Sequence, residues 1–318
     1  MPQPLHSMSE FEADVRAGLS KHPQKELFSK YFYDDMGSAL FDAITVLPEY
    51  GLTRADRRLL RRHVRELAGR TTNHSVVVEL GSGSGEKARE ILPYLAAERQ
   101  ITYCPIDLSS AALSRCVRDL DDLRNLRIFP IENSYIHGLR AASAKYRRPG
   151  TAMLVLFLGS SIGNFVPEVA ESFLKTIRET LQPGDVFFLS ADLVKPLDQM
   201  LAAYNDAIGL TAAFNLNLLA RINRELGANF QLRNFQHEAR YNESEQRIEM
   251  HLRSTVRQTV SVNGHFTVDL APGETIWTES SYKFLPDQIR SMAERAGFRC
   301  ECQWLDAQWP FAQTLLRV

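Results

Sequence analysis

The sequence predicts an α/β protein with a doubly wound parallel sheet and a second, smaller α+β domain. From Ser75 onward, short apolar runs alternate with stretches of helical periodicity, as expected for strands joined by crossover helices. A glycine-rich turn follows the first of these runs. The alternation stops after Lys195, where a helical stretch and then an antiparallel pattern begin. These observations indicate one doubly wound domain and a region of a different kind.

The elements of the first part follow from periodicity and from end signals. Residues 1–60 are expected to form helices around an aromatic-rich loop, and a long helix should run from Thr53, as its N-cap with Asp56 three residues on, to about Leu67. Helices should also begin near Glu86, Ser109 and Pro167. The expected parallel strands are Val76–Leu80, Ile101–Ile106, Leu126–Ile131, Met153–Leu158 and Val186–Ala191.

The part after Lys195 contains a different succession of elements. Residues 201–227 have helical periodicity, and residues 247–261 alternate apolar and polar side chains as a half-buried strand does. Asn263-Gly264 predicts a hairpin that pairs this strand with residues 266–270. A further strand over residues 275–284 would complete a small antiparallel unit.

The C-terminal residues predict a return to the first sheet. A helix over Pro286–Ala296, ended by Gly297, precedes two expected strands, Arg299–Leu305 and Ala312–Val318. We therefore interpret the antiparallel unit as an insertion that joins the N-terminal helices. The predicted domains are residues 61–196 with 285–318, and residues 1–60 with 197–284.

Composition excludes several classes of protein. Of the 318 residues, 44% are hydrophobic and 24% are charged, as in a globular protein. The net charge of −1 and the absence of a long basic block argue against a nucleic-acid binder, and the arginines of residues 57–62 have the spacing of a solvated helix face. The cysteines form no C-x-x-C pair, so no metal site is predicted.

The longest apolar run argues against a segment that crosses a membrane. It spans residues 153–158, which is too short to cross a bilayer, and the N-terminus lacks a basic stretch followed by an apolar core. We therefore expect no membrane association and a cytoplasmic location. A monomer is a separate expectation.

The glycine-rich turn is the first candidate binding element. Residues 76–87 read as a buried strand, a turn with Gly81 and Gly83, and the start of a helix, which lets backbone N–H groups approach a ligand. The next strand ends at Asp107, at the spacing where an acid reaches ribose hydroxyls. The alternatives are a mere turn and a helix N-cap at Asp107, and a nicotinamide-dependent oxidoreductase would share both features.

Two details of this turn disfavour a dinucleotide. The loop reads G-S-G-S-G instead of G-x-G-x-x-G, and Glu79 lies just before the end of the strand. The pattern E-L-G-x-G-x-G resembles the first motif of class I methyltransferases, which have a Rossmann-like fold. The resemblance implies S-adenosylmethionine as the cofactor.

A more specific resemblance extends over nearly the whole chain. Its motifs are Tyr31-Phe32-Tyr33-Asp34, Leu47-Pro48-Glu49-Tyr50, Phe157-Leu158-Gly159-Ser160-Ser161-Ile162-Gly163-Asn164-Phe165, Asp192-Leu193-Val194-Lys195, Ala212-Ala213-Phe214-Asn215 and Arg247-Ile248-Glu249-Met250. With these motifs the chain resembles the histidine Nα-methyltransferases of ergothioneine biosynthesis. The resemblance implies a class I methyltransferase domain, a substrate-binding domain, and trimethylation of the α-amino nitrogen of L-histidine to hercynine.

The resemblance also implies which residues bind the substrate. Asn164 and Tyr204 would hold the amino acid headgroup, and Glu279 would accept a hydrogen bond from the imidazole. From the residues alone, Asn164 could satisfy a turn, Tyr204 could be a core tyrosine, and Glu279 with Ser281 could be a solvent-exposed polar pair, since both lie on one strand face. The complete set of expected substrate-binding residues is Tyr33, Tyr50, Asn164, Tyr204, Met250, Glu279 and Ser281.

The expected cofactor-binding residues come from the first motif, the end of the second strand and a later loop. They are Glu79, Gly81, Gly83, Lys87, Asp107, Ser134 and Tyr135. Lys87 could also be an exposed residue of a first helical turn. Two departures from the family pattern are Gly51, where a second tyrosine is usual, and Ser134, where an acidic residue usually precedes the aromatic one.

Other functions remain open at this stage. No general acid or base is assigned, because an amine nucleophile needs alignment more than activation. An enzyme of the same fold could methylate another aromatic amino acid, such as a tryptophan derivative, although Glu279 and Met250 argue against this. A nicotinamide-dependent oxidoreductase and a non-catalytic binding module are alternatives of a different class.

Overall fold

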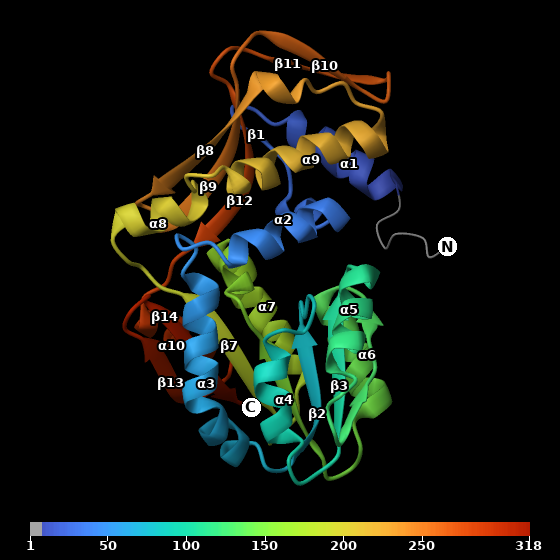
Figure 1. Ribbon diagram of the computed structural model, residues 1–318, viewed down its shortest axis with the longest axis vertical. Helices are drawn as coiled ribbons and strands as arrows, with labels where there is room; N and C mark the ends of the chain where they lie inside the picture. The colour runs from blue at the N-terminus through green and yellow to red at the C-terminus, as the bar shows by residue number, and fades with distance from the viewer. Residues whose placement is uncertain (1–7) are drawn as a thin grey trace. The chain divides into compact units, whose positions relative to one another are not determined.

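The computed structural model describes residues 8–318, which form two compact units (Figure 1). Unit 1 contains the chain up to Gly51 and residues 195–282, and unit 2 contains residues 52–194 and 283–318. The first division precedes α3 (Leu52–Arg70), a continuous helix, whereas the predicted boundary at residue 60 falls inside it. Assigning cofactor binding to one unit and substrate binding to the other stays a prediction.

The sheet of unit 2 has eight strands in the order β13-β14-β7-β6-β2-β3-β4, with β5 also paired to β3. The pairs among β2, β3, β4, β5, β6 and β7 are parallel, and β14 is antiparallel to both β7 and β13. Chain order reverses beside β2, so the carboxyl ends of β2 and β6 border a topological switch point. The bounds are β2 (His74–Leu80), β3 (Ile101–Asp107), β4 (Leu126–Ile128), β5 (Ile131–Glu132), β6 (Ala152–Phe157), β7 (Val186–Asp192), β13 (Arg299–Asp306) and β14 (Phe311–Arg317).

Helices cover both faces of this sheet because its central strands are apolar on both sides. On one face, alternate strand residues such as Val78 and Val155 form a buried cluster with α6 (Tyr135–Tyr146), α7 (Pro167–Thr180) and α10 (Pro286–Arg295). The opposite face packs against α3, α4 (Ala88–Leu95) and α5 (Ser110–Leu120). A sheet covered on both faces needs strands that are apolar almost throughout, and this is why apolar runs in the sequence predicted these strands.

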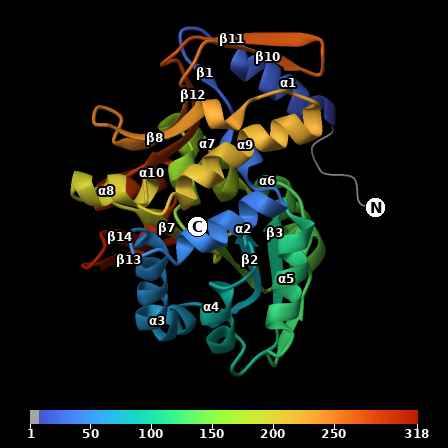
Figure 2. The same cartoon turned by 45° about the horizontal axis from the view of Figure 1, so that its top comes forward.

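Unit 1 is built around a smaller mixed sheet in the order β1-β12-β9-β8, with a separate hairpin of β10 and β11. Figures 1 and 2 show α2 and α9 side by side in this unit. Asp34 links them, because its carboxylate accepts the Gly37 N–H at the start of α2 and the Asn217 Nδ2–H of α9, at 2.7 and 2.8 Å. The bounds are α1 (Met8–Leu19), β1 (Lys25–Glu26), α2 (Asp35–Thr45), α8 (Leu197–Tyr204), α9 (Leu210–Leu226), β8 (Phe235–Asn242), β9 (Arg247–Ser254), β10 (Gln258–Val262), β11 (Phe266–Leu270) and β12 (Thr275–Tyr282).

Several expected elements are divided in the structure. Residues 201–227 form two helices, because the Asp206 carboxylate accepts the Leu210 and Thr211 N–H groups and starts α9 anew. The strand expected over residues 247–261 ends at Ser254 and resumes as β10. The strand expected over residues 126–131 is split into β4 and β5.

Other expectations were wrong or incomplete in detail. Thr53 is not an N-cap, because α3 already begins at Leu52, and Asp56 is fully buried. The sequence analysis did not anticipate α6 or β8. The hairpin at Asn263-Gly264 is confirmed, with Val262 opposite Phe266.

A buried ion pair fastens the two segments of unit 2 that lead into unit 1. The Phe284 N–H donates to the Asp192 carbonyl at 3.1 Å, and the Val194 N–H donates to the Phe284 carbonyl at 3.0 Å. The Lys283 ammonium lies 3.1 Å from Asp192 Oδ2, and Trp309 Nε1–H donates to Oδ1 at 3.1 Å. Both ionic side chains are almost completely buried, so the charges depend on each other and on these neighbours.

Replacing Lys283 with methionine should therefore destabilise the fold strongly. The change retains an unbranched side chain but removes the cation from a buried carboxylate, which typically costs about 3–5 kcal/mol of unfolding free energy. Urea titration followed by circular dichroism measures this loss. Lys175→Met, which removes an exposed ion pair to Glu171, is the control and should leave the urea midpoint nearly unchanged. Equal midpoints for the two variants would contradict the importance of the buried pair.

Candidate functional site

The glycine loop after β2 adopts a backbone that only glycine enters without strain. Gly81, Gly83 and Gly85 have φ values of +72°, +53° and +79°. The Gly81 and Ser82 N–H groups both donate to the Ile106 carbonyl, at 2.8 and 3.1 Å, and so tie the loop to the end of β3. A Cβ added at Gly81 would lie 3.2 Å from the Tyr135 ring, whereas one at Gly83 would meet no atom within 4 Å. The space over Gly83 is therefore open to a ligand, as a cofactor loop requires.

Asp107 lies at the carboxyl end of β3 and contacts this loop directly. Its Oδ2 accepts the Gly83 N–H and its Oδ1 accepts the Ser109 N–H, both at 2.9 Å. The N-cap of α5 is Ser109, whose hydroxyl oxygen accepts the Ala112 N–H at 3.1 Å, so the alternative of Asp107 as the N-cap is not what the structure shows. A carboxylate held beside a glycine loop is suited to accept hydrogen bonds from ribose hydroxyls.

Tyr135 and Ser134 approach the same loop from the start of α6. The Tyr135 ring lies against Gly81 and makes an edge contact with Phe157, at 5.4 Å between ring centres. Burial and the nearby Asp107 charge raise the pKa of the Tyr135 hydroxyl to about 12, which keeps it protonated. Ser134 is the exposed N-cap residue, and its hydroxyl lies 3.1 Å from His137 Nδ1. Gly81, Asp107 and Tyr135 are therefore gathered at the carboxyl edge of the sheet.

Glu79 lies inside unit 2 and has a different environment. Its buried carboxylate accepts a hydrogen bond from the Tyr103 hydroxyl of the neighbouring strand. Burial raises the pKa of Glu79 to about 7, against the hydrogen bond from Tyr103, which lowers it. Its contribution to cofactor binding stays a prediction.

The loop after β6 presents Asn164. Ser160, the second residue of this loop after Gly159, has a left-handed backbone, φ +65°, and its hydroxyl oxygen accepts the Asp192 N–H at 2.8 Å. A short 3-10 helix, Ser161–Asn164, follows. Within residues 8–318 the half-buried Asn164 amide makes no side-chain hydrogen bond, so both its donor and its acceptor are available. The alternative of a turn-satisfying asparagine has no support in these contacts.

Unit 1 brings together four of the expected substrate-binding residues, with Met250, Glu279 and Ser281 on one face of its sheet and Tyr204 of α8 beside Ser281. Glu279 lies opposite Met250, and Ser281 lies opposite Ile248, so both polar side chains share the face of buried apolar neighbours. The Tyr204 hydroxyl and the Ser281 hydroxyl are 2.6 Å apart. Ser281 is buried and Glu279 half-buried, so they are not the solvent-exposed pair that was the alternative.

The strand carrying Glu279 is irregular just before it. The pairing of β12 with β9 shifts between Trp277 and Glu279, which places Thr278 in a bulge. The Thr278 hydroxyl lies 2.7 Å from Asn215 Oδ1 of α9 and 3.0 Å from the Met250 carbonyl oxygen. Asn215 is fully buried and its Nδ2–H also donates to the His251 carbonyl at 3.1 Å. These contacts fix the bulge, and through it the direction of Glu279.

Aromatic rings connect the remaining expected residues of unit 1. Tyr33 contacts Phe41, Phe41 contacts Tyr50, and Tyr50 contacts Tyr204, with ring centres 5.5, 6.2 and 6.4 Å apart. Phe214 touches both Tyr33 and Phe41. Phe41 was missed by the sequence analysis, because an apolar residue on a predicted helix carries no signal that separates a ligand pocket from ordinary core.

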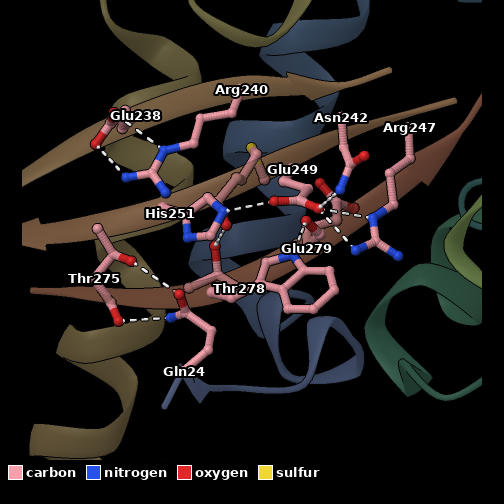
Figure 3. A network of polar contacts seen from close by, with 12 residues as sticks. Gln24, Glu238, Arg240, Asn242, Arg247, Glu249, His251, Thr275, Thr278 and Glu279 are labelled. Carbon is pink, nitrogen blue, oxygen red and sulfur yellow. Dashed lines mark hydrogen bonds and ion pairs between the residues drawn. The ribbon is translucent and has the colours of Figure 1, made fainter. Parts of the chain in front are cut away.

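The other face of the same sheet is ionic (Figure 3). Glu249 accepts hydrogen bonds from Arg247 Nε–H at 2.8 Å and Asn242 Nδ2–H at 3.0 Å, and its second oxygen lies 3.1 Å from His251 Nε2. Although burial acts to raise the pKa of Glu249, these hydrogen bonds hold it below its usual value. Burial lowers the pKa of His251 despite the Glu249 contact. Strand β9 thus carries an ionic network on one face and Met250 on the face of Glu279.

Two further findings concern metals and membranes. Among residues 8–318, no group of histidine, cysteine, aspartate and glutamate is arranged to hold a metal ion. No helix in the same part of the chain is long and apolar enough to cross a membrane.

The raised pKa of Glu79 predicts a pH-dependent stability. Because the folded-state pKa lies above the ordinary value of 4.5, its contribution is fully present below pH 4.5 and is lost as pH rises to about 7. Glu79→Gln should therefore gain stability relative to the unsubstituted protein over this interval, by up to about 3 kcal/mol. Urea titrations of both proteins at pH 5 and pH 7.5 measure the difference. A difference independent of pH would contradict the assignment.

Comparison with known proteins adds evidence independent of this geometry. The family model of SAM-dependent histidine-specific methyltransferases matches residues 11–318. The chain is 41% identical over 305 residues to a histidine N-alpha-methyltransferase of Mycolicibacterium smegmatis, covering 95% of this chain and 93% of the relative. It is 39% identical over 305 residues, with the same coverage, to the protein of that name in Mycobacterium tuberculosis. A 4-dimethylallyltryptophan N-methyltransferase of Epichloe festucae var. lolii is 29% identical over 198 residues, 59% of this chain and 56% of the relative. This chain therefore belongs to the family of SAM-dependent histidine-specific methyltransferases.

Proposed function

We propose that this protein transfers methyl groups from S-adenosylmethionine to the α-amino nitrogen of L-histidine, giving hercynine after three transfers, in ergothioneine biosynthesis. The observation that carries the proposal is the half-buried Glu279 carboxylate on the same sheet face as the Tyr204–Ser281 hydroxyl pair. The names of the two mycobacterial relatives support it. A nicotinamide-dependent oxidoreductase has no support, because the chain belongs to a methyltransferase family.

Histidine suits the polar groups of unit 1 better than other aromatic amino acids do. Glu279 would accept a hydrogen bond from the imidazole N–H, and Met250 would pack beside the ring. A phenylalanine side chain would leave the carboxylate desolvated without a donor, which is costly and disfavours such a substrate. Ser281 would complete the contact to the imidazole, and Tyr204 would donate to the substrate carboxylate. Tyr33 and Tyr50 would supply the aromatic wall.

The glycine loop of unit 2 has the features that S-adenosylmethionine needs. Gly81 and Gly83 would let the ligand approach the backbone, Asp107 would accept hydrogen bonds from the ribose, and Tyr135 would lie against the adenine. Lys87 carries a cation, and the methionine part of the cofactor ends in a carboxylate. Ser134 and Glu79 complete the proposed set. Bound S-adenosylmethionine supplies a methyl group on a positively charged sulfur.

The contribution proposed for the protein is the positioning of the two reactants, and no residue is assigned as a general acid or base. In its neutral form the amine carries the lone pair that attacks the methyl carbon while the bond from that carbon to the sulfur breaks. After each of the first two transfers the nitrogen must release a proton to solvent before it can attack again. Alignment can lower the barrier by on the order of 7–11 kcal/mol in favourable cases. The Asn164 amide would orient the amino group because its donor and acceptor are both available. We also propose that the enzyme acts as a monomer in the cytoplasm.

Replacing Glu279 should separate substrate recognition from cofactor binding. Glu279→Ala should lower kcat/KM for histidine about 10- to 100-fold, because a charge-assisted hydrogen bond is lost. The Kd of S-adenosylmethionine, measured by calorimetry, should change less than about twofold. Glu238→Ala, on the ionic face of the same sheet, is the matched control and should retain turnover. Undiminished histidine turnover by Glu279→Ala would refute the assigned role.

Mass spectrometry of the products should identify the substrate. With excess S-adenosylmethionine, histidine is expected to give a product heavier by three methyl groups, whereas tryptophan and tyrosine should remain unmodified. The comparison matters because one relative of this chain is named for a tryptophan derivative. Faster methylation of tryptophan than of histidine would overturn the proposed substrate while leaving the methyltransferase family intact.

A further inference from the structure

Asp56 is a fully buried aspartate in the first turns of α3, and the sequence suggested only a helix-capping role for it. Its Oδ1 accepts a hydrogen bond from Ser190 Oγ at 2.8 Å and another from Gln313 Nε2 at 2.7 Å. Its Oδ2 accepts the Gly159 N–H at 3.0 Å and lies 3.4 Å from the Lys87 ammonium. The carboxylate is thus contacted on both oxygens by donors from four separate segments of unit 2.

The two oxygens contact different kinds of structure. Ser190 and Gln313 face each other on β7 and β14, so Oδ1 is fixed to the rigid sheet. Gly159 opens the loop that ends at Asn164, and Lys87 follows the glycine loop. Oδ2 therefore connects the two loops to each other, while Oδ1 anchors both to the sheet.

The contact between the two loops is close at Gly159. This residue has φ +77°, and a side chain there would collide with the Lys87 ammonium. The Lys87 ammonium and the Gly159 N–H also share one carboxylate oxygen. The end of the Lys87 side chain and the backbone of Gly159 are therefore held next to each other at the Asp56 carboxylate.

We propose that Asp56 is a positioning residue for the methyl transfer. Through Lys87 and Gly159 it holds the glycine loop and the Asn164 loop in one arrangement, and so sets the affinity for S-adenosylmethionine and the placement of Asn164. The roles of Lys87 and Asn164 in this inference rest on the proposed function. Asp56 itself touches neither ligand in this account.

Asp185 shows what a purely structural buried aspartate looks like in the same unit. It is also fully buried, and it precedes β7, whereas Ser190 lies near the other end of that strand. Its carboxylate accepts hydrogen bonds from Arg147, from the Met153 N–H at 2.7 Å and from the Gln182 N–H at 2.8 Å. None of these partners belongs to either loop, so Asp185 is the matched control for burial without positioning.

A double-mutant cycle on cofactor affinity tests the proposal. Asp56→Asn and Lys87→Met should each weaken S-adenosylmethionine binding about 10-fold. The double variant should bind little more weakly than either single variant, because Asp56 is proposed to act on the cofactor through Lys87. Asp185→Asn should lower the melting temperature yet leave the Kd within about twofold. At saturating cofactor, Asp56→Asn should also lower kcat for histidine more than it raises KM, because Asn164 is displaced.

Two results would overturn the proposal: equal losses of affinity in Asp56→Asn and Asp185→Asn, or effects of Asp56→Asn and Lys87→Met that simply multiply. If Asp56→Asn does not fold, Gly159→Ala tests the same link, because its methyl group must displace the Lys87 ammonium. An unchanged Kd in Gly159→Ala would then overturn it. Since the affinities are measured without histidine, failure of the unsubstituted protein to methylate histidine would reject the proposed function but leave this cycle interpretable.

Discussion

The hydrogen bonds between the end of β3 and the glycine loop are the constraint on which the candidate cofactor site of unit 2 depends. The Ile106 carbonyl accepts two loop N–H groups and the Asp107 carboxylate accepts a third, from Gly83. A loop of glycines has more conformational freedom to lose than any other sequence, so it takes up one shape only where such bonds select it. The parallel register of β2 and β3 brings Leu80 beside Ile106 and thereby makes these bonds geometrically available. Loop geometry is thus a consequence of strand register.

In unit 1, the direction of the Glu279 side chain depends in a similar way on the bulge in β12. Regular pairing along β12 would continue the alternation set by Ile276 and Trp277, but the shift before Glu279 changes which side chains face α8 and α9. Asn215 and Thr278 make the bulge stable by satisfying each other in a buried environment. The direction of the Glu279 side chain therefore depends on Asn215 and Thr278, which lie beside it in the fold and fix the bulge.

Strands covered on both faces could be predicted from the sequence because burial on two sides leaves continuous apolar runs, as at Val76–Leu80. Strand β8 was missed because only Phe235 in it is buried, and its charged residues form the ionic face with β9. The break between α8 and α9 depends on Asp206, whose carboxylate accepts the first two N–H groups of the second helix, a contact that periodicity does not encode. The family resemblance supplied the candidate residues, but their partners, such as Tyr204 with Ser281, required the fold.

Asp56 was misread for a related reason. An aspartate near a helix start usually caps the helix, and nothing local distinguishes one whose partners lie 103, 134 and 257 residues away. Buried carboxylates seldom stabilise a fold more than well-packed apolar residues would, because desolvation offsets the attraction. Asp56 and Asp192 nevertheless both lie toward the carboxyl end of the sheet in unit 2, where the Ser190 hydroxyl donates to the Asp56 carboxylate and Trp309 Nε1–H donates to the Asp192 carboxylate. An apolar side chain in either position could not make these hydrogen bonds.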